Sequence, residues 1–539
     1  MLSSQNTRVA VVSSFMLLVL NGLFFGFHLD NYHSSIKAIF EGFFTLNQPF
    51  SEFYFSAFLG IDFLLGILYN NFQSVNWYSL FLIAVNIPSA IIVGLTISEL
   101  LNQNLRIKIF GTLIGSQLIL GSSIWLVDAT YSITLFYVLS SIYIFYFKPK
   151  LESIILINIW MVFGAFTRFD TSLLSILILV PIFIYVSKLK TILLAKRIAI
   201  PILVSLAIAT GYYVNSQNSS NVFDSSTYDL YLVSDGNFRK PISAFTAPSD
   251  SIKYEAVVEH FYNDPQNITS EFIKSMILSS KVEIIPLIGR SMRVFSHKLI
   301  RISKHYSSIL IVLIGALLII FSTSRNKLKS AFITFLILVE LLVILVLIKM
   351  EGRFMFPVLS GLVMVLLIFN LSEISKVNNY FLWGIVVMVS GLTASIQFQK
   401  SNQVSKVENQ NKEYLEVIKT AVSDNLVLFD TKSGKISNTG AFEDFYLDSN
   451  RFLSVDYSEL SLWPKSQTIL QNWCNCNTSR FDEYFKHIET TASPVYYCST
   501  RKRFKFIKEY LRIVYNYNLK SNKEMEMDLP NDIILVRIN

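Results

Sequence analysis

A carboxylate stands directly after the first long apolar run of the chain. Residues 9–27 are apolar and lead into His-Leu-Asp-Asn-Tyr-His at 28–33. A carboxylate at the mouth of a membrane-spanning helix is partly desolvated, which raises its pKa toward values that suit a general base. The same position also suits a residue that caps the following segment, 34–43. Asp30 is therefore a candidate general base, with helix capping as the alternative.

Two arginines lie in short polar stretches between apolar runs. Arg168 belongs to Thr-Arg-Phe-Asp at 167–170, and Arg353 follows Glu351 in a loop of a few residues. A guanidinium at such a depth is costly unless it is paired, and Asp170 is an obvious partner for an internal ion pair. Arginine also presents a planar fork that binds phosphate oxygens. Each stretch is either a structural ion pair or a phosphate contact.

A third group of cations recurs at helical spacing. Basic side chains stand at steps of three and four at Arg290, Arg293, His297, Arg301 and Lys304. On a helix this spacing places them on one face. A basic amphipathic helix next to a spanning segment commonly lies on anionic lipid headgroups. The alternative is that this face binds the phosphate of a lipid-linked substrate.

The composition requires a membrane around these residues. Hydrophobic residues make up 52% of the 539, charged residues 16%, and the mean hydropathy is +0.47. These values are too apolar for a soluble chain of this length. Runs of about 20 apolar residues predict a polytopic α-helical membrane protein with about eleven spans. The predicted spans are 9–27, 78–101, 107–127, 131–147, 151–166, 172–186, 198–214, 307–322, 331–348, 354–371 and 380–398.

The distribution of Lys and Arg predicts the orientation. The net charge is +8, but the basic residues stand in short clusters between apolar runs, as orientation signals do, which argues against nucleic-acid binding. All four of the most basic short loops face the cytoplasm only if the segment 53–69 does not cross. Asp62 at its centre would cost about 2.5 to 3.5 kcal/mol in a bilayer. The sequence therefore predicts outer loops at 29–77 and 215–306.

The same orientation places Asp128 in a short outer loop. It could share the role of a base or hold a cation, although an Asp in a short loop is more often only a cap or turn residue.

The last part of the chain has a different character. Residues 404–422 predict a polar helix, and 425–430 and 532–538 predict strands. Residues 399–539 are thus expected to form a soluble α/β domain outside the membrane. All three cysteines fall in it. A bridge from Cys474 or Cys476 to Cys498 is one option, and a Cys-x-Cys without a nearby His pair argues against zinc.

Residues 8–398 resemble the multispanning GT-C glycosyltransferases that use polyprenyl-phosphate sugars. The resemblance rests on Asp30 after the first helix, Thr-Arg-Phe-Asp at 167–170, the long outer loop after the seventh helix, and Glu-Gly-Arg-Phe-Met-Phe-Pro at 351–357. Many members have a Thr-Arg-Pro-Glu-like turn, where this chain has Phe169 in place of proline. The first loop also carries a single Asp30 where members have an adjacent pair of acidic residues.

The resemblance implies transfer of a sugar from a polyprenyl-phosphate carrier to an extracytoplasmic glycan, lipid or protein, with inversion in one displacement. It implies Asp30 as the base, with Asp128 as a second carboxylate. The expected substrate-binding residues are His33, Arg168, Arg290, Arg293, Arg301, Glu351 and Arg353. No metal ligand is assigned, although the class allows a divalent metal. The expected location is a bacterial inner membrane, with membrane lipids and the lipid-linked donor as partners.

Two other functions compete with this one. A flippase or transporter would also hold charges in a bundle, but it needs a path to both faces of the membrane, whereas these charges cluster on one. A polysaccharide polymerase usually depends on Arg-rich outer loops and lacks a sizeable terminal domain.

Overall fold

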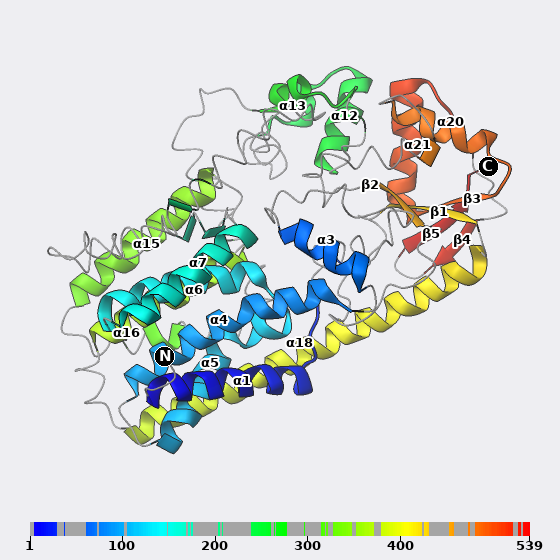
Figure 1. Cartoon of the computed structure of the whole chain (residues 1–539). Helices are drawn as coiled ribbons and strands as arrows, with labels where there is room; N and C mark the ends of the chain where they lie inside the picture. The colour runs from blue at the N-terminus through cyan, green and yellow to red at the C-terminus, as the bar shows by residue number, and fades with distance from the viewer. Residues whose placement is uncertain are drawn as a thin grey trace.

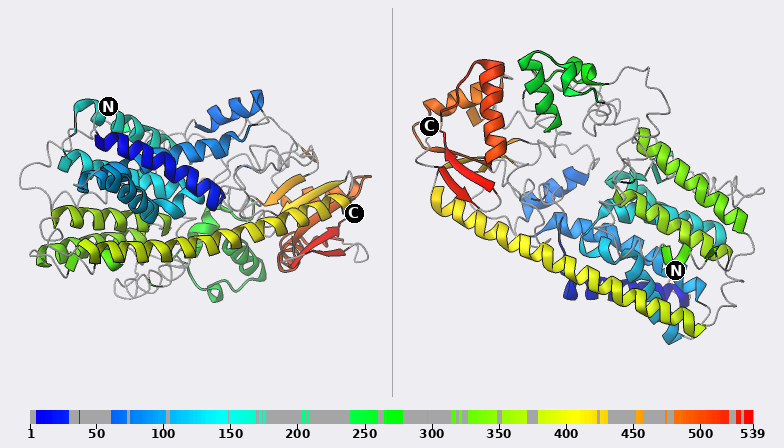
Figure 2. Two further views of the ribbon diagram at one scale, coloured as in Figure 1. Left: turned by 90° about the horizontal axis from the view of Figure 1, so that it is seen from below. Right: turned by 180° about the vertical axis from the view of Figure 1, so that it is seen from behind.

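The computed structural model places a helical bundle at one end of the molecule and a small sheet domain at the other (Figure 1). With short gaps, it describes residues 5–29, 61–175, 239–277, 314–370, 379–430, 452–456 and 480–538, and a few isolated positions. A single long helix, α18, connects the two parts (Figures 1 and 2).

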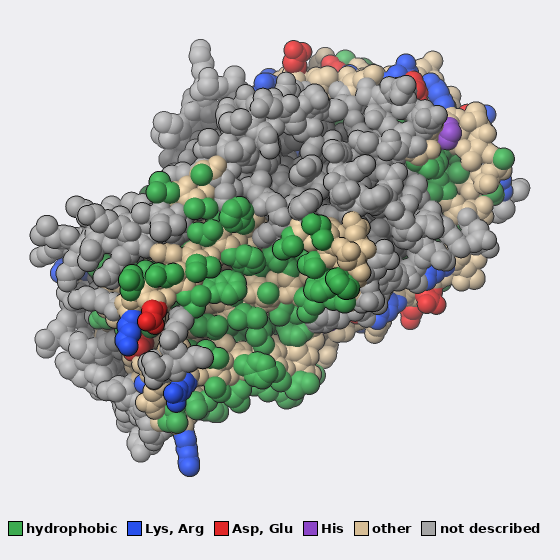
Figure 3. Space-filling view, viewed as in Figure 1, with side chains coloured by type: hydrophobic (Ala, Val, Ile, Leu, Met, Phe, Trp, Pro, Cys, Tyr) green, Lys and Arg blue, Asp and Glu red, His purple; other side chains and the backbone are tan. Residues whose placement is uncertain are grey.

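The bundle contains the predicted membrane helices. They are α1 (Gln5–Phe24), α4 (Trp77–Leu100), α5 (Leu105–Trp125), α6 (Ala129–Phe147), α7 (Leu151–Thr167), α15 (Lys327–Leu347), α16 (Gly352–Phe369) and the first half of α18. Among the described residues, α1, α4 and α6 are long and apolar enough to cross a membrane, and α7 and 354–368 are shorter apolar helices. Apolar side chains cover the face of the bundle in Figure 3. The chain is an integral membrane protein. The predicted spans 172–186, 198–214 and 307–322 lie wholly or mostly outside the described residues.

Small residues and buried amides hold the bundle together. A Cβ on Gly94 of α4 would lie 3.2 Å from the Cα of Ala10 in α1, so the two helices approach closely. The side chain of Asn21 donates to Gln117 at 2.8 Å, and Gln117 donates to Gln397 at 2.8 Å. These amides join α1, α5 and α18 inside the apolar region, where small residues and interhelical hydrogen bonds are the usual means of association.

Helix α3 (Ile61–Asn71) lies between the bundle and the sheet domain. Eleven residues rise about 16 Å, which is short of the roughly 30 Å of a hydrocarbon core. Leu65 and Tyr69 are buried, whereas Leu64 and Ile67 are exposed. The hydroxyl of Tyr69 accepts a hydrogen bond from the backbone N–H of Tyr78 at the start of α4. Residues 53–60 lie outside the described residues, so the prediction that 53–69 stays on the outer side remains a prediction.

Helix α18 (Asn379–Val422) is continuous over 44 residues, or about 66 Å. The sequence predicts two helices here, 380–398 and 404–422, and the separation between them is wrong. No Gly or Pro occurs at 392–422, so nothing ends the helix where its composition changes from apolar to polar. The helix therefore carries the chain from the bundle directly into the sheet domain (Figure 2).

The C-terminal domain is an α/β module, as predicted. Its strands are β1 (Leu426–Asp430), β2 (Phe452–Asp456), β3 (Val495–Thr500), β4 (Glu526–Leu529) and β5 (Ile533–Arg537), and its helices include α20 (Phe481–Thr490) and α21 (Arg501–Tyr515). The strand order is β2-β1-β3-β5-β4. Strand β1 is parallel to β2 and β3, whereas β5 is antiparallel to β3 and β4.

The structure decides the states of two cysteines. Cys474 takes part in a disulfide, but Cys498 is a free, buried thiol, so the option of a bridge to Cys498 is wrong. The Cys498 Sγ lies 2.8 Å from the hydroxyl of Tyr414 on α18. Burial raises the pKa of this thiol to about 12, which keeps it neutral and unreactive.

The described part of the loop 215–306 contains η2 (Ile242–Ala244), α12 (Pro248–Val258) and α13 (Ser270–Met276). Helix α12 packs against α21 of the C-terminal domain (Figure 1).

Candidate active site

The segment that leaves α1 folds back against the end of α5. Gly26 adopts a φ of +69°, a conformation that side chains rarely allow. The backbone N–H of His28 donates to the carbonyl of Trp125 at 2.8 Å. Its ring meets the Trp125 ring edge-on, with centroids 5.9 Å apart. Leu29 is 1% exposed and is the last described residue before Asp30.

Asp128 lies three residues after Trp125, at the start of α6. Its Oδ1 accepts a hydrogen bond from the backbone N–H of Tyr131 at 3.0 Å, which is the geometry of a helix N-cap. Its own N–H donates to the carbonyl of Ser123 at 2.8 Å. The side chain is almost fully buried. Its hydrogen bond with the N–H of Tyr131 shows that Asp128 caps α6. A second role as a base stays a prediction.

Most of the other predicted site residues lie outside the described residues. They are Asp30, His33, Arg290, Arg293, Arg301 and Glu351. Arg353 is in the first turn of α16, but its side chain is outside the description. Arg168 ends α7, and its N–H donates to the carbonyl of Gly164 at 2.8 Å. The structure thus brings the end of the segment 25–29 and the Asp128 turn together.

Glu408, on the polar half of α18, is a site residue that sequence reasoning missed. Its Oε2 lies 3.2 Å from Nδ1 of His28, and both side chains are buried. The other ring nitrogen, Nε2, lies 3.0 Å from the carbonyl of Phe25. The hydroxyl of Ser401 on α18 donates to the same carbonyl at 2.6 Å. The only sequence signal was a histidine two residues before Asp30, because a partner 380 residues away leaves no local pattern.

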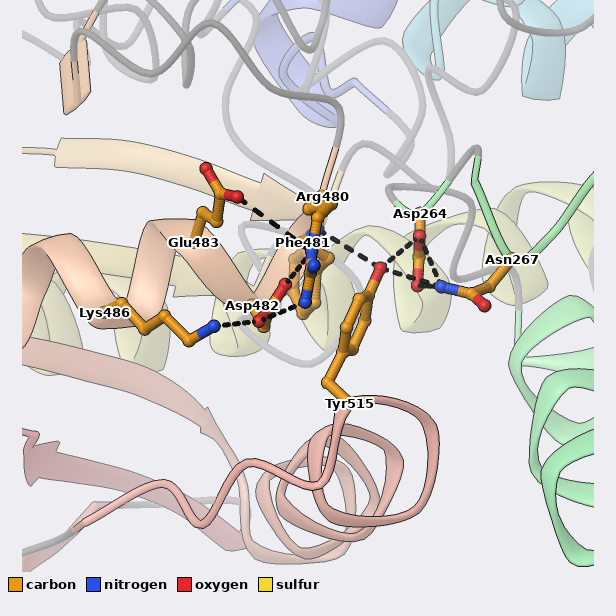
Figure 4. A network of polar contacts seen from close by, with 8 residues as sticks. All are labelled: Asp264, Asn267, Arg480, Phe481, Asp482, Glu483, Lys486 and Tyr515. Carbon is orange, nitrogen blue, oxygen red and sulfur yellow. Dashed lines mark hydrogen bonds and ion pairs between the residues drawn. The ribbon is translucent and has the colours of Figure 1, made fainter.

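The loop 215–306 is bound to the C-terminal domain through a buried carboxylate (Figure 4). Asp264 accepts hydrogen bonds from the hydroxyls of Tyr515 at 2.6 Å and Tyr510 at 2.7 Å, and from the amide of Asn267 at 3.0 Å. Burial raises the pKa of Asp264, and these hydrogen bonds offset only part of that rise. Tyrosines from α21 therefore hold the loop at a single buried acid.

A charged cluster supports the same tyrosine. The guanidinium of Arg480 stacks over the Tyr515 ring, 5.3 Å from its centroid, and donates to Asp482 at 3.0 and 3.1 Å (Figure 4). Lys486 also donates to Asp482, at 2.5 Å. Burial of Asp482 alone would raise its pKa, but the hydrogen bonds and charges of Arg480 and Lys486 outweigh burial and lower the pKa. The cluster therefore places a paired cation over the ring of the tyrosine that binds Asp264.

A buried ion pair makes the second contact between loop and domain. Arg503, near the start of α21, donates through Nε to Asp430 at the end of β1, at 3.1 Å, and both side chains are buried. Its Nη1 donates to the carbonyl of Glu259, which ends α12, at 3.1 Å. In parallel sheets, the carboxyl ends of neighbouring strands commonly bind a ligand. Here the loop contacts that edge.

Among the described residues, no group of three His, Cys, Asp or Glu side chains is placed to hold a metal ion. Asp30 is not among those residues, so the structure does not bear on a cation beside it.

Comparison with known proteins gives one match. No family model and no curated protein matches the chain. Among solved structures, the chain is similar to the crystal structure of ArnT from Cupriavidus metallidurans in the apo state. The two sequences are 11% identical, the match covers 99% of each chain, and the TM-score is 0.32. At this identity and TM-score the likeness identifies no function.

Proposed function

We propose that this protein is a membrane glycosyltransferase of the GT-C type, which moves a sugar from a polyprenyl-phosphate carrier to an acceptor outside the cytoplasm. The observation that carries the proposal is the hydrogen bond from His28 to Trp125. It places the segment that leads into Asp30 beside the turn that carries Asp128. Two carboxylates therefore belong to neighbouring segments at one end of an apolar bundle.

The proposed reaction is a single displacement. Asp30 takes the proton of an acceptor hydroxyl, the oxygen attacks the anomeric carbon, and the bond from that carbon to the phosphate oxygen breaks, which inverts the carbon. The lipid phosphate leaves with the negative charge. Such a step needs a base within reach of the nucleophile and cations near the leaving group.

The proposed cations come from three parts of the chain. Arg168 at the end of α7 and Arg353 in the first turn of α16 would contact the leaving phosphate. The basic face that includes Arg293 and Arg301 would bind the phosphate of the donor from the second outer loop. His33 and Glu351 would contact the substrate. Arginine suits these roles because its planar fork matches phosphate oxygens.

The proposed location is a bacterial inner membrane, with both outer loops and residues 399–539 on the extracytoplasmic side. The basic short loops would then face the cytoplasm. Donor and acceptor would meet between the outer end of the bundle and the C-terminal domain.

Asp30→Asn tests the proposal, because it keeps the size of the side chain and removes its proton affinity. The variant should fold and bind donor, while sugar transfer from a polyprenyl-phosphate donor falls about 10²- to 10⁴-fold. Asn is an equally good helix cap, so a pure cap would leave transfer intact. Full transfer by Asp30→Asn would refute the mechanism. If the protein moved the lipid-linked sugar across the membrane of proteoliposomes without transferring the sugar to an acceptor, the proposal of a glycosyltransferase would be refuted.

Asp128→Asn, measured in parallel, separates the two roles of that residue. Asn keeps the acceptor for the N–H of Tyr131, so the cap survives. A fall in kcat with unchanged stability would show that Asp128 shares in proton transfer, whereas unchanged kcat would leave it as a cap.

A further inference from the structure

We infer that His28 and Glu408 are positioning residues, through which the polar half of α18 fixes the outer end of the bundle for the reaction. The inference rests on the proposed function. It concerns residues that touch neither substrate nor reacting atoms but decide where the segments of the two carboxylates lie.

The hydrogen bonds of His28 fix its ring in one orientation. Nδ1 faces the carboxylate of Glu408 at 3.2 Å, and Nε2 faces the carbonyl of Phe25 at 3.0 Å. Both partners are acceptors, so the ring can donate a hydrogen bond to either of them. On the other side of Glu408, the ammonium of Lys412 lies 3.6 Å from Oε1 and its side chain is half exposed. A charge-assisted hydrogen bond at a buried site is stronger than a neutral one.

The backbone transmits this restraint to the candidate carboxylates. His28 donates to the carbonyl of Trp125, one of the last carbonyls of α5, which lack partners within the helix. The next residues form the turn to Asp128. On the other side, two residues of chain span at most about 7 Å, so whatever fixes His28 also restricts Asp30. A misplacement of about 1 Å at a reacting group can cost on the order of 100-fold in rate.

Helix α18, which carries Glu408, continues into the C-terminal domain. Helix α18 ends at Val422 and leads into β1. The far end of β1 carries Asp430, the partner of Arg503 at the contact with the second outer loop. The contact between Glu408 and His28 therefore connects the orientation of the C-terminal domain to the first outer loop.

The kinetic test compares variants of Glu408 in the full-length protein. Glu408→Ala should lower kcat at least about tenfold and leave the KM for the lipid-phosphate donor within twofold. Glu408→Gln, which keeps an acceptor at the same reach, should recover most of the loss. Ser401→Ala removes only the second contact of α18 to this segment, and should give a smaller fall in kcat. Glu413→Ala, on the exposed side of the same helix, is the matched control and should keep native kcat.

Hydrogen exchange gives a readout that does not depend on transfer. In Glu408→Ala, the amides of His28 and Asp128 should exchange faster than in the native protein and in Glu413→Ala. If native protein transfers sugar but Glu408→Ala and Ser401→Ala keep native kcat, the positioning inference is wrong and the function stands. Equal loss in Glu408→Gln and Glu408→Ala, or a donor KM that rises as much as kcat falls, would also overturn it. Faster exchange in a protein that never transfers sugar would refute the function alone.

Discussion

The hydroxyl of Tyr515 donates a hydrogen bond to Asp264 at 2.6 Å, across 251 residues of chain. Tyr515 ends α21 of the C-terminal domain, and Asp264 lies between α12 and α13 of the loop 215–306. The carboxylate is buried and also accepts from Tyr510. Loss of these hydrogen bonds would leave a buried polar group without its partners, which is energetically costly. Loop and domain therefore form one unit beyond the end of the bundle.

The raised pKa of Asp264 predicts a pH-dependent stability. For an acid whose pKa is raised by burial, the folded state holds the proton more tightly than the unfolded state. Its stabilising contribution is present below the ordinary pKa of 3.8 and is lost as pH rises through the folded-state pKa. The side chain in Asp264→Asn is neutral at every pH, so this variant does not share the loss of stability that native protein undergoes as pH rises. The melting temperature of the variant minus that of native protein should therefore be larger at pH 7 than at pH 4. If the difference in melting temperature between Asp264→Asn and native protein did not change with pH, the raised pKa of Asp264 would be contradicted.

Removal of the buried partner of Asp430 should unfold the C-terminal domain readily. Arg503→Ala leaves the carboxylate buried without its guanidinium, and such changes cost about 3 to 5 kcal/mol. Pulse proteolysis of the full-length protein in urea would measure the loss. Arg512→Ala on the same helix is the control, because its pair with Glu509 is at the surface and contributes little. If the two variants lowered the free energy of unfolding equally, the buried pair would contribute no more to stability than the surface pair.

Neutralising the basic face should weaken donor binding more than turnover. Arg293→Gln with Arg301→Gln removes cations that would bind the donor phosphate in ground state and transition state alike. Uniform binding affects KM and not kcat, so initial rates at varied donor concentration should show a raised KM with kcat nearly unchanged. An unchanged donor KM would leave this face as an anchor on lipid headgroups.

Cysteine labelling in intact cells tests the orientation of the membrane domain. In a variant without the native cysteines, an impermeant thiol reagent should label Asn71→Cys at the end of α3 and Glu416→Cys on the polar half of α18. Cysteines placed in the basic loop 102–108 should be labelled only after the cells are opened. Labelling of Asn71→Cys only in opened cells would show that the segment 53–69 crosses.

Local pattern alone determined the membrane helices and the class of the C-terminal domain. Eight of the eleven predicted spans coincide with described helices, and the strands at 425–430 and 532–538 are β1 and β5. A run of apolar residues identifies a span because the bilayer is a nearly uniform solvent, whatever the neighbours of the run are. The strands were recognisable for a similar reason, since their short apolar runs are typical of a buried sheet.

Tertiary structure decided the partners of the polar residues. Glu408 reaches His28 across 380 residues, and α18 runs unbroken where its composition suggested two helices. Several carboxylates in the sequence could cap a helix, and the structure showed that Asp128 accepts from the N–H of Tyr131. Hydrogen-bond partners are selected by the packing of whole helices, and a buried polar group takes whichever partner the fold brings within about 3 Å. A single sequence carries no local trace of that selection.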